Sequence, residues 1–405
     1  MIVTGLMTGT SADALDVALV DFSVIRGEDG DELVMDLLDH GEVPFPSDLG
    51  RDLLRLLEPG SVPLSLVADV DSRLGVLSAD AVQGILDANR VDCDLVVSHG
   101  QTVQHLLSDG VVRGTLQVGQ PAWIAERTGC PVLSDVRARD VAAGGQGAPL
   151  ASMLDSLLFA DASEATAAVN LGGIANITVL SPGSPPVAYD TGPANALIDV
   201  MARRITGDPH GIDRDGALAG RGRVVEPLLE DLLAEPYYRQ PAPKSTGKEL
   251  FHAGHLDRAL ASRPGLDPHD VIATVTRLTA LTVAAECHRH GVTRAVVSGG
   301  GTHNPALMTE LRRALGDGVV LEPIDSTGLP GDAKEAALMA LLGWLTWHGL
   351  PATVASCTGA SRATPAGRLT PGRRPLILPE PRPRLPRRLR VTARPEPSTS
   401  VEGDL

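Results

Sequence analysis

A strand–turn–strand pattern with glycine in its turn occurs twice in this sequence. The first copy is MIVTGLMTGTSADALDVALVDF at the N-terminus, where two apolar runs flank a polar turn at residues 8–13. The second is AAVNLGGIANITVL at residues 167–180. The repetition predicts two halves that each begin with an antiparallel hairpin. Each turn on its own is more often structural, because glycine is the common residue where a short turn needs positive φ.

Strand-like and helix-like segments alternate through most of the remaining chain. The patterns predict strands at 95–98, 167–171, 174–180 and 295–298, and helices at 271–288, 304–315 and 333–347. This alternation is typical of an α/β fold. If two similar lobes meet at a cleft, both hairpin turns lie on it, where their backbone N–H groups can hold a polyphosphate.

Length and charge restrict the kind of partner. The chain has 405 residues, enough for two or three domains and a large enzyme. A net charge of −15 argues against nucleic-acid and anionic-membrane partners, so we expect a small-molecule ligand. The four cysteines form no CxxC pair, and we expect neither export nor a membrane span. These features predict a cytoplasmic protein.

The end of the chain differs in composition from the rest. From Gly372 the sequence is dense in arginine and proline and has little apolar periodicity. This composition predicts a disordered, solvated tail over residues 372–405. The alternative is that its arginines form a docking patch for an acidic partner.

A third glycine cluster lies in AVVSGGGTHNPALMTEL, between a buried-looking strand and a helix that begins near Asn304 or Pro305. The chain contains neither the GxxxxGK[ST] phosphate loop nor a GxGxxG motif after a predicted strand. A tight turn would explain one glycine, but three let a flat ring or a phosphate approach the backbone closely. We therefore favour a ligand-binding role for Gly299, Gly300 and Gly301.

An acidic residue stands at the end of an extended stretch in YDTGPANALID. Asp190 precedes a Gly192–Pro193 turn and a helix that begins near Asn195, so its carboxylate can project into a cleft. Asp in this position also commonly caps the following turn or helix. The local sequence supports both interpretations equally.

Polar residues are concentrated at residues 115–151, around short apolar runs and a GGQGAP loop. They suit a sugar-sized polar ligand, because Arg binds carboxylate or phosphate while Asp and Gln bind hydroxyl groups. An internal network of Asp–Arg salt bridges is an equal alternative. The residues are Gln117, Asp135, Arg137, Arg139, Asp140 and Gln146. His99 and Gln101, in SHGQT, follow another strand end, where open α/β sheets hold their ligands.

Taken together, the motifs give the chain a family resemblance. They are, in order, GLMTGTSADALD, SHGQTVQH, LQVGQPAWIAERTG, SDVRARDVAAGGQGAPL, NLGGIANIT, DTGPANALID, DRDGALA, PKSTGKELF, SGGGTHNP and TGA near Thr358. Over roughly residues 2–371 the sequence closely resembles the anhydro-N-acetylmuramic acid kinases, members of the sugar kinase, Hsp70 and actin superfamily.

The resemblance implies two actin-like (ribonuclease H-like) lobes around a central nucleotide and sugar cleft. The lobes would span residues 1–140 and 141–371, and part of the first could continue from the C-terminal helix of the second. The resemblance also implies ATP and Mg²⁺ as cofactors, a homodimer, and a role in recycling cell-wall sugars in the cytoplasm.

The resemblance also implies roles for particular residues. Asp190 would be the catalytic base, and Gln117, Arg137 and Asp140 would hold the sugar; no metal ligand is assigned. ATP would bind Gly9, Thr10, Ser11, Ala12, Asp13, Ala14, Leu15, Asp16, Gly172, Gly173, Gly299, Gly300 and Gly301.

The implied reaction opens the 1,6-anhydro bridge of 1,6-anhydro-N-acetylmuramic acid with water and phosphorylates the freed O6. Two alternatives remain: a nucleotide-binding regulator of the same fold, and a kinase or phosphohydrolase acting on another substrate. The chain departs from the family pattern at two positions. Ala12 stands where a bulky apolar residue is usual, and Ala14 stands where glycine is usual. Alanine at position 14 would be costly if that backbone needs positive φ, and tolerated if it does not.

Overall fold

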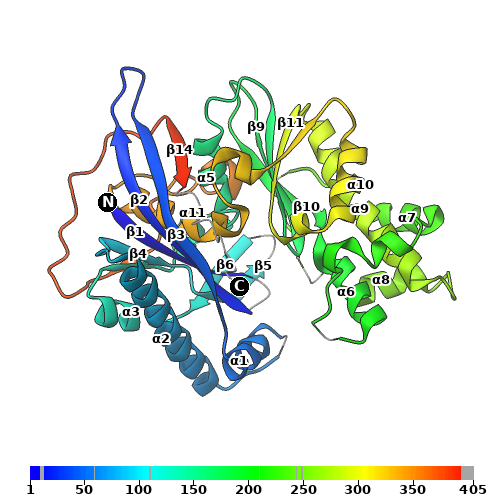
Figure 1. Ribbon diagram of the computed structural model, residues 1–405, viewed down its shortest axis with the longest axis horizontal. Helices are drawn as coiled ribbons and strands as arrows, with labels where there is room; N and C mark the ends of the chain where they lie inside the picture. The colour runs from blue at the N-terminus through cyan, green and yellow to red at the C-terminus, as the bar shows by residue number, and fades with distance from the viewer. Residues whose placement is uncertain are drawn as a thin grey trace, which may run out of the picture.

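The computed structural model of this chain describes residues 1–9, 13–58, 60–108, 111–208, 210–242, 244–247 and 250–393. These residues form two lobes, each built on one β-sheet (Figure 1). The first sheet contains β1 (Ile2–Thr8), β2 (Ala14–Ile25), β3 (Glu32–Pro44), β4 (Leu95–Ser98), β7 (Val132–Ser134), β13 (Arg368–Thr370) and β14 (Arg388–Ala393). The second contains β8 (Thr166–Leu171), β9 (Ile174–Leu180), β10 (Val187–Pro193), β11 (Arg294–Ser298) and β12 (Val320–Pro323).

The two sheets share one topology. Strands β3-β2-β1-β4-β7 in the first lobe match β10-β9-β8-β11-β12 in the second. In each set the first three strands pair antiparallel and the last two run parallel. Each lobe begins with a hairpin, in which Thr8 pairs with Leu15 and Leu171 pairs with Ala175. The predicted two-lobed α/β fold is therefore confirmed.

The predicted elements are present with small differences at their ends. Strands β4 and β9 have the predicted bounds, while β8 and β11 begin one residue earlier. The predicted helices are α9 (Pro268–Arg289), α10 (Pro305–Leu315) and α11 (Lys334–Trp347). The second lobe also contains α6 (Asn195–Thr206), α7 (Glu226–Leu233) and α8 (Ala253–Leu260), and its core includes side chains of α6, α7, α9 and α10.

Helices cover both faces of the first sheet. Helices α2 (Leu64–Asn89) and α3 (Pro121–Thr128) bury one face, and α11 buries the other together with α5 (Ala151–Leu158). Helix α11 lies very close to the sheet, because a Cβ on Gly5 would overlap the carbonyl oxygen of Ala336, and one on Gly343 would overlap the side chain of Val97. The helix therefore holds β1 and β4 in a fixed position.

The chain returns to the first lobe after β12, which corrects the predicted boundary at residue 371. Helix α11 packs against β1, β2 and β4, and β13 pairs with β7. The physical reason is that α11 is apolar nearly all round and is buried from Ala336 to Leu345, so it must be covered on every side.

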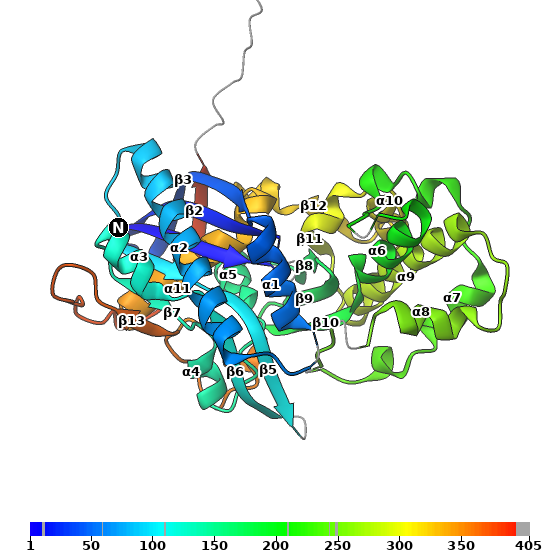
Figure 2. The same cartoon turned by 90° about the horizontal axis from the view of Figure 1, so that it is seen from below.

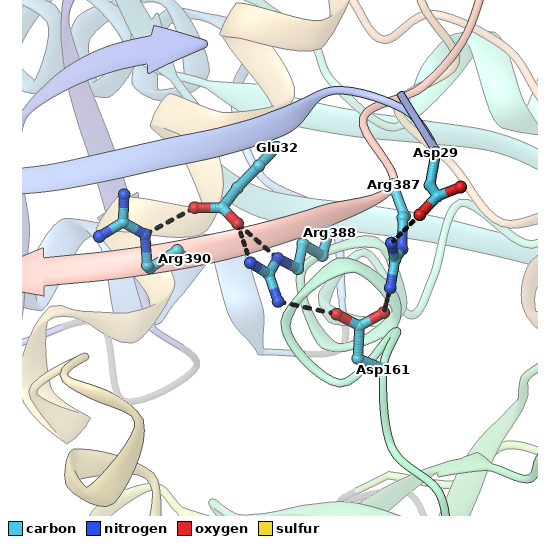
Figure 3. Close-up of polar contacts among 6 residues, drawn as sticks. All are labelled: Asp29, Glu32, Asp161, Arg387, Arg388 and Arg390. Carbon is cyan, nitrogen blue, oxygen red and sulfur yellow. Dashed lines mark hydrogen bonds and ion pairs between the residues drawn. The ribbon is translucent and has the colours of Figure 1, made fainter. Parts of the chain in front are cut away.

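The expectation of disorder from residue 372 is corrected for residues 372–393. Strand β14 pairs parallel with β3, and Leu389 and Val391 are buried. The arginines that alternate with them bind acids: Arg390 Nε donates to Glu32 Oε1 at 2.6 Å and Arg388 Nη1 contacts Asp161 Oδ2 at 2.9 Å (Figure 3). Residues 394–405 lie outside the described part of the chain. A short alternation of apolar and basic residues is thus enough to add an edge strand.

The remaining elements lie around these lobes. Strands β5 (Gln101–Ser108) and β6 (Val111–Val118) form a separate ribbon that extends from the first lobe in Figure 2. The short helices are α1 (Ser47–Leu57), α4 (Ala138–Ala142) and α12 (Ala355–Thr358). Within the described ranges, every helix is too short or too polar to cross a bilayer.

Candidate active site

The turn of the second hairpin is fixed to the start of α6. The carbonyl oxygen of Gly172 accepts the backbone N–H of Asn195 at 2.9 Å, and that of Gly173 accepts those of Ala194 and Ala196 at 3.0 and 2.9 Å. Strand β10 runs directly into this helix, so the turn and the end of β10 form one rigid unit. Both predicted hairpin glycines are therefore beside the strand that carries Asp190.

The third glycine loop lies next to this turn. Strand β11 pairs with β8 up to Ser298 and Asn170, and a Cβ on Gly301 would lie 2.7 Å from that of Leu171. Gly299 has φ +87°, whereas a Cβ on Gly300 would meet nothing within 4 Å. The start of α10 is already capped, since Asn304 Oδ1 accepts two backbone N–H groups. Gly300 is thus the open part of the loop.

Asp190 lies within β10, at an irregularity in its pairing with β9. Its Oδ2 accepts the hydroxyl of Ser245 at 2.8 Å and the backbone N–H of Thr246 at 3.0 Å. The carboxylate is half-buried. Two donors on one oxygen orient the group. The N-cap residue of α6 is Ala194, so Asp190 is not the N-cap of that helix, which was one part of the alternative interpretation.

On the first lobe, the predicted phosphate hairpin brings an unusual carboxyl group to the end of β1. Burial, followed by repulsion from Glu335, Glu42, Asp13 and Asp332, raises the pKa of Asp16 to about 7. The backbone carbonyl of Asp13 accepts the backbone N–H of Phe45 at 2.8 Å, which anchors the start of β2. Such a group of acids would be stabilised by a cation. Thr10, Ser11 and Ala12 lie outside the described residues.

Ala14 is the first residue of β2, paired with Pro44, and is nearly buried. Among the described residues other than glycine, positive φ occurs at Arg90, Asp135 and Asp215 alone. The methyl group of Ala14 therefore causes no backbone strain. The departure from the family's glycine at this position is structurally tolerated.

Lys334, at the start of α11, joins the two lobes, and neither it nor the neighbouring Glu335 is among the site residues predicted from the sequence. Lys334 Nζ donates to Ser298 Oγ at 3.1 Å and contacts Asp155 Oδ1 at 3.2 Å. Burial raises the pKa of the neighbouring Glu335, while Lys334 and Arg137 lower it. Glu335 thus lies within electrostatic range of both Asp16 and Arg137. The only feature of the sequence that could have indicated Lys334 and Glu335 as site residues is a charged pair at the start of a very apolar helix.

Arg137 is held by His99. Arg137 Nε donates to His99 Nε2 at 2.8 Å, and His99 Nδ1 donates to the Gly100 carbonyl at 2.5 Å. Burial, and then the Arg137 charge, lowers the pKa of His99 to about 3, so the ring is neutral and accepts at Nε2. Burial lowers the pKa of Arg137 to about 10, which leaves it cationic at neutral pH. A second bond, from Nη1 to the Gly147 carbonyl at 2.7 Å, completes the orientation.

Gln117 lies on a cavity of about 250 Å³ that is also lined by His99, Ser134, Asp135 and Arg368. Its Nε2 donates to Thr102 Oγ1 at 3.0 Å and to Thr115 Oγ1 at 2.8 Å. Its Oε1 and the hydroxyl of Ser134 are buried and lack a hydrogen-bond partner among the described residues. Buried polar atoms normally have partners, so the pair suits a polar ligand.

Asp140 has a different position from the one predicted. It has no exposed surface: its Oδ2 accepts the Gly147 N–H at 2.8 Å and its Oδ1 accepts the Thr358 hydroxyl at 2.8 Å. Asp140 therefore supports the GGQGAP loop at residues 144–149. It helps to fix Gly147, whose carbonyl accepts a hydrogen bond from Arg137. Its two partners are a loop N–H and a threonine hydroxyl. Asp140 is therefore not part of an internal Asp–Arg network, which is the alternative that the sequence allows.

Comparison with known proteins identifies the family. Residues 1–372 match the family model described as anhydro-N-acetylmuramic acid kinase. Relatives with this name include one from Streptomyces coelicolor, 54% identical over 397 residues, or 98% of this chain and 100% of the relative. Another, from Streptomyces avermitilis, is 50% identical over 94% of this chain and 97% of its own. A third, from Rhodococcus erythropolis, is 45% identical over 97% of this chain and 100% of the relative. The chain belongs to the anhydro-N-acetylmuramic acid kinase family.

Proposed function

We propose that this protein is an ATP-dependent kinase that hydrolyses the 1,6-anhydro bridge of 1,6-anhydro-N-acetylmuramic acid and phosphorylates O6. The products are N-acetylmuramic acid 6-phosphate and ADP, formed in the recycling of cell-wall sugars. Beyond family membership, the observation that carries the proposal is the position of Asp190. Its carboxylate is held by Ser245 and Thr246 on the strand that leads into the glycine turn.

ATP would bind between the two hairpins. The carbonyl groups of Gly172 and Gly173 are occupied by the start of α6, so this turn offers its N–H groups to an anion. Gly9 and residues 13–16 would approach the phosphates from the first lobe. The open position at Gly300 would lie against the adenosine. In this arrangement, backbone N–H groups from both lobes bind the phosphates. Such donors are needed because the protein lacks a phosphate loop with a lysine.

The described residues fit a magnesium ion through Asp16 and Glu335. The pKa of Asp16 is raised by burial and by neighbouring acids, so a nearby cation would favour its ionised form. Mg²⁺ in phosphate-transfer sites is commonly held by one or two carboxylates together with phosphate and water, and Asp16 and Glu335 would supply these carboxylates. When bound, the ion would neutralise charge on the phosphates.

The sugar would lie between Arg137 and Asp190. The guanidinium of Arg137, oriented by His99 and Gly147, suits the lactyl carboxylate. The unpartnered oxygens of Gln117 and Ser134 suit hydroxyl or amide groups of a polar ligand in the cavity that they line. Asp140 acts only through the loop that it supports.

In the reaction, Asp190 takes a proton from a water molecule positioned on the face of the sugar opposite O6. The water oxygen forms a bond to the anomeric carbon as the bond from that carbon to O6 breaks. O6 then attacks the γ-phosphorus, and ADP leaves. Because the departing oxygen is captured by the phosphoryl group, no separate general acid is needed, and ring opening is coupled to the use of ATP.

The test is ADP release by the purified protein with Mg²⁺, measured with 1,6-anhydro-N-acetylmuramic acid, with N-acetylglucosamine and without sugar. We expect release only with the anhydro sugar, and none from Asp190→Asn. Nucleotide binding without turnover would favour a regulator instead. Release without sugar would favour a phosphohydrolase, and release with the other sugar a different kinase. The homodimer and the cytoplasmic location remain predictions from the family resemblance.

A further inference from the structure

The segment 244–246 and Tyr237 form hydrogen bonds with the backbone and the side chain of Asp190. The backbone N–H of Asp190 donates to the carbonyl of Lys244 at 3.3 Å, and its carbonyl accepts the Tyr237 hydroxyl at 2.7 Å. The side chain is held by Ser245 and Thr246. Both the backbone and the carboxylate of this residue are therefore fixed by a single short stretch and one tyrosine.

A buried ion pair lies behind that stretch. Lys244 Nζ contacts Glu286 Oε1 at 2.9 Å, with side-chain exposures of 1% and 4%. The ammonium group also lies 5.0 Å from the centre of the Tyr237 ring and 5.6 Å from that of Tyr189. Desolvating two charges is expensive, and such pairs often add little net stability. Here the pair fixes the segment that carries Ser245.

The other groups around the pair complete its hydrogen bonds. Tyr189 donates to Glu286 Oε2 at 3.1 Å, its hydroxyl lies 2.6 Å from His290 Nε2, and Arg289 Nε contacts the same Glu286 oxygen at 3.1 Å. Tyr189 directly precedes Asp190 on β10. The buried network thus anchors both sides of Asp190: β10 through Tyr189, and the contacting segment through Lys244.

We infer that Ser245, Tyr237 and the Lys244–Glu286 pair are positioning residues of the reaction, which hold Asp190 in the orientation from which it takes the proton of the attacking water. Ser245 acts on the carboxylate directly. Tyr237 and the ion pair act through the backbone. The inference rests on the proposed function, in which Asp190 is the base.

Two neighbouring tyrosines provide a matched test of the backbone contact. Tyr237→Phe removes the hydroxyl that binds the Asp190 carbonyl, whereas Tyr238→Phe removes a buried hydroxyl with no hydrogen-bond partner among the described residues. We expect kcat to fall about 3- to 10-fold in Tyr237→Phe, with KM for ATP unchanged, and to stay within about twofold in Tyr238→Phe. Equal kcat values for the two variants would overturn the role of Tyr237.

Ser245 is on the surface, so its replacement leaves the fold intact. We expect Ser245→Ala to lower kcat by about 10-fold or more and Ser245→Thr, which keeps the hydroxyl, to restore most of it. The acidic limb of kcat/KM should move to higher pH in Ser245→Ala, because a donor to the ionised carboxylate is lost. Tyr189, Tyr237, Lys244, Glu286, Arg289 and His290, the other ionisable groups here, are unchanged in this variant.

Asp190→Asn separates the two levels of the proposal. If this variant is inactive while Ser245→Ala keeps the kcat and pH profile of the wild type, the positioning inference is overturned and the proposed function stands. If Asp190→Asn keeps full activity, Asp190 is not the base and the positioning inference falls with it, whereas the proposed function fails only if the wild type releases no ADP with the anhydro sugar. Loss of activity in Asp190→Asn, together with a lower kcat and a shifted acidic limb in Ser245→Ala, supports both.

Discussion

Lys334 donates a hydrogen bond to Ser298 at 3.1 Å, although α11 packs on the first sheet and β11 belongs to the second. The same ammonium group contacts Asp155 Oδ1, and both charged side chains are almost completely buried. The next residue, Glu335, is within electrostatic range of Asp16. The start of α11 is thus the point where both lobes and the predicted phosphate hairpin meet.

Removing this ion pair should destabilise the protein strongly. We expect Lys334→Met to lower the free energy of unfolding by about 3–5 kcal/mol, because it leaves the Asp155 carboxylate buried without its partner. Arg127→Ala, which breaks the exposed pair with Asp80, is the control and should cost at most about 1 kcal/mol. Urea unfolding of both variants measures the difference. Equal losses would show that burial of the Lys334 pair is unimportant.

The raised pKa of Asp16 should make stability depend on pH. The folded protein holds the Asp16 proton up to about pH 7, whereas the unfolded chain releases it near 3.8. The folded state therefore binds more protons in this window, and the contribution of Asp16 to stability falls as pH rises through it. We expect Asp16→Asn to be more stable than wild type at pH 8 without ligand, with little difference at pH 4. Thermal unfolding at the two pH values checks this, and an unchanged gap would refute it.

Ala14 should not limit activity, because its backbone is extended and unstrained. Ala14→Gly, which restores the usual family residue, should leave kcat unchanged and lower stability by about 0.5–1 kcal/mol. Steady-state kinetics and urea unfolding of the variant measure both quantities. A large gain in kcat would mean that the methyl group contacts the phosphates.

Strand β14 should stabilise the first lobe through its apolar side chains rather than its arginines. Leu389 is 4% exposed, and we expect Leu389→Ala to cost about 2–5 kcal/mol. Arg388→Ala, in the same strand, should have a much smaller effect that decreases in high salt, because the Arg388 side chain in these ion pairs with Glu32 and Asp161 is 47% exposed. Denaturant unfolding at low and high salt separates the two. A larger loss for Arg388→Ala would reverse this assignment.

Much of the fold could be predicted from the sequence because its strands carry strong local signals. The two hairpins repeat a visible pattern, and β4, β9 and β11 are short apolar runs between polar turns. Strand β14 could not be predicted, because three apolar or small residues among arginines resemble a solvated tail until β3 supplies a partner edge. Pairing over such a distance along the chain leaves no local signal.

The candidate site was only partly predictable. Asp190 and the glycine turns could be selected as candidates because each stands at the end of an apolar stretch, and their roles stay predictions. Glu335 was missed, since an acid in the first turn of a helix is ordinary until Asp16 and Arg137 are seen nearby. Asp140 was assigned to the sugar because local sequence cannot show that Gly147 and Thr358 occupy both of its oxygens.

The most direct test of the central claim follows the oxygen of water. The protein is incubated with ATP, Mg²⁺ and 1,6-anhydro-N-acetylmuramic acid in ¹⁸O-labelled water, beside Asp190→Asn, and the sugar product is examined by mass spectrometry. We predict a phosphorylated sugar with the label at its anomeric oxygen, formed by the wild type and absent from the variant. Phosphorylated sugar without the label, or the same labelled product from folded Asp190→Asn, would contradict the role of Asp190 as the base that activates water.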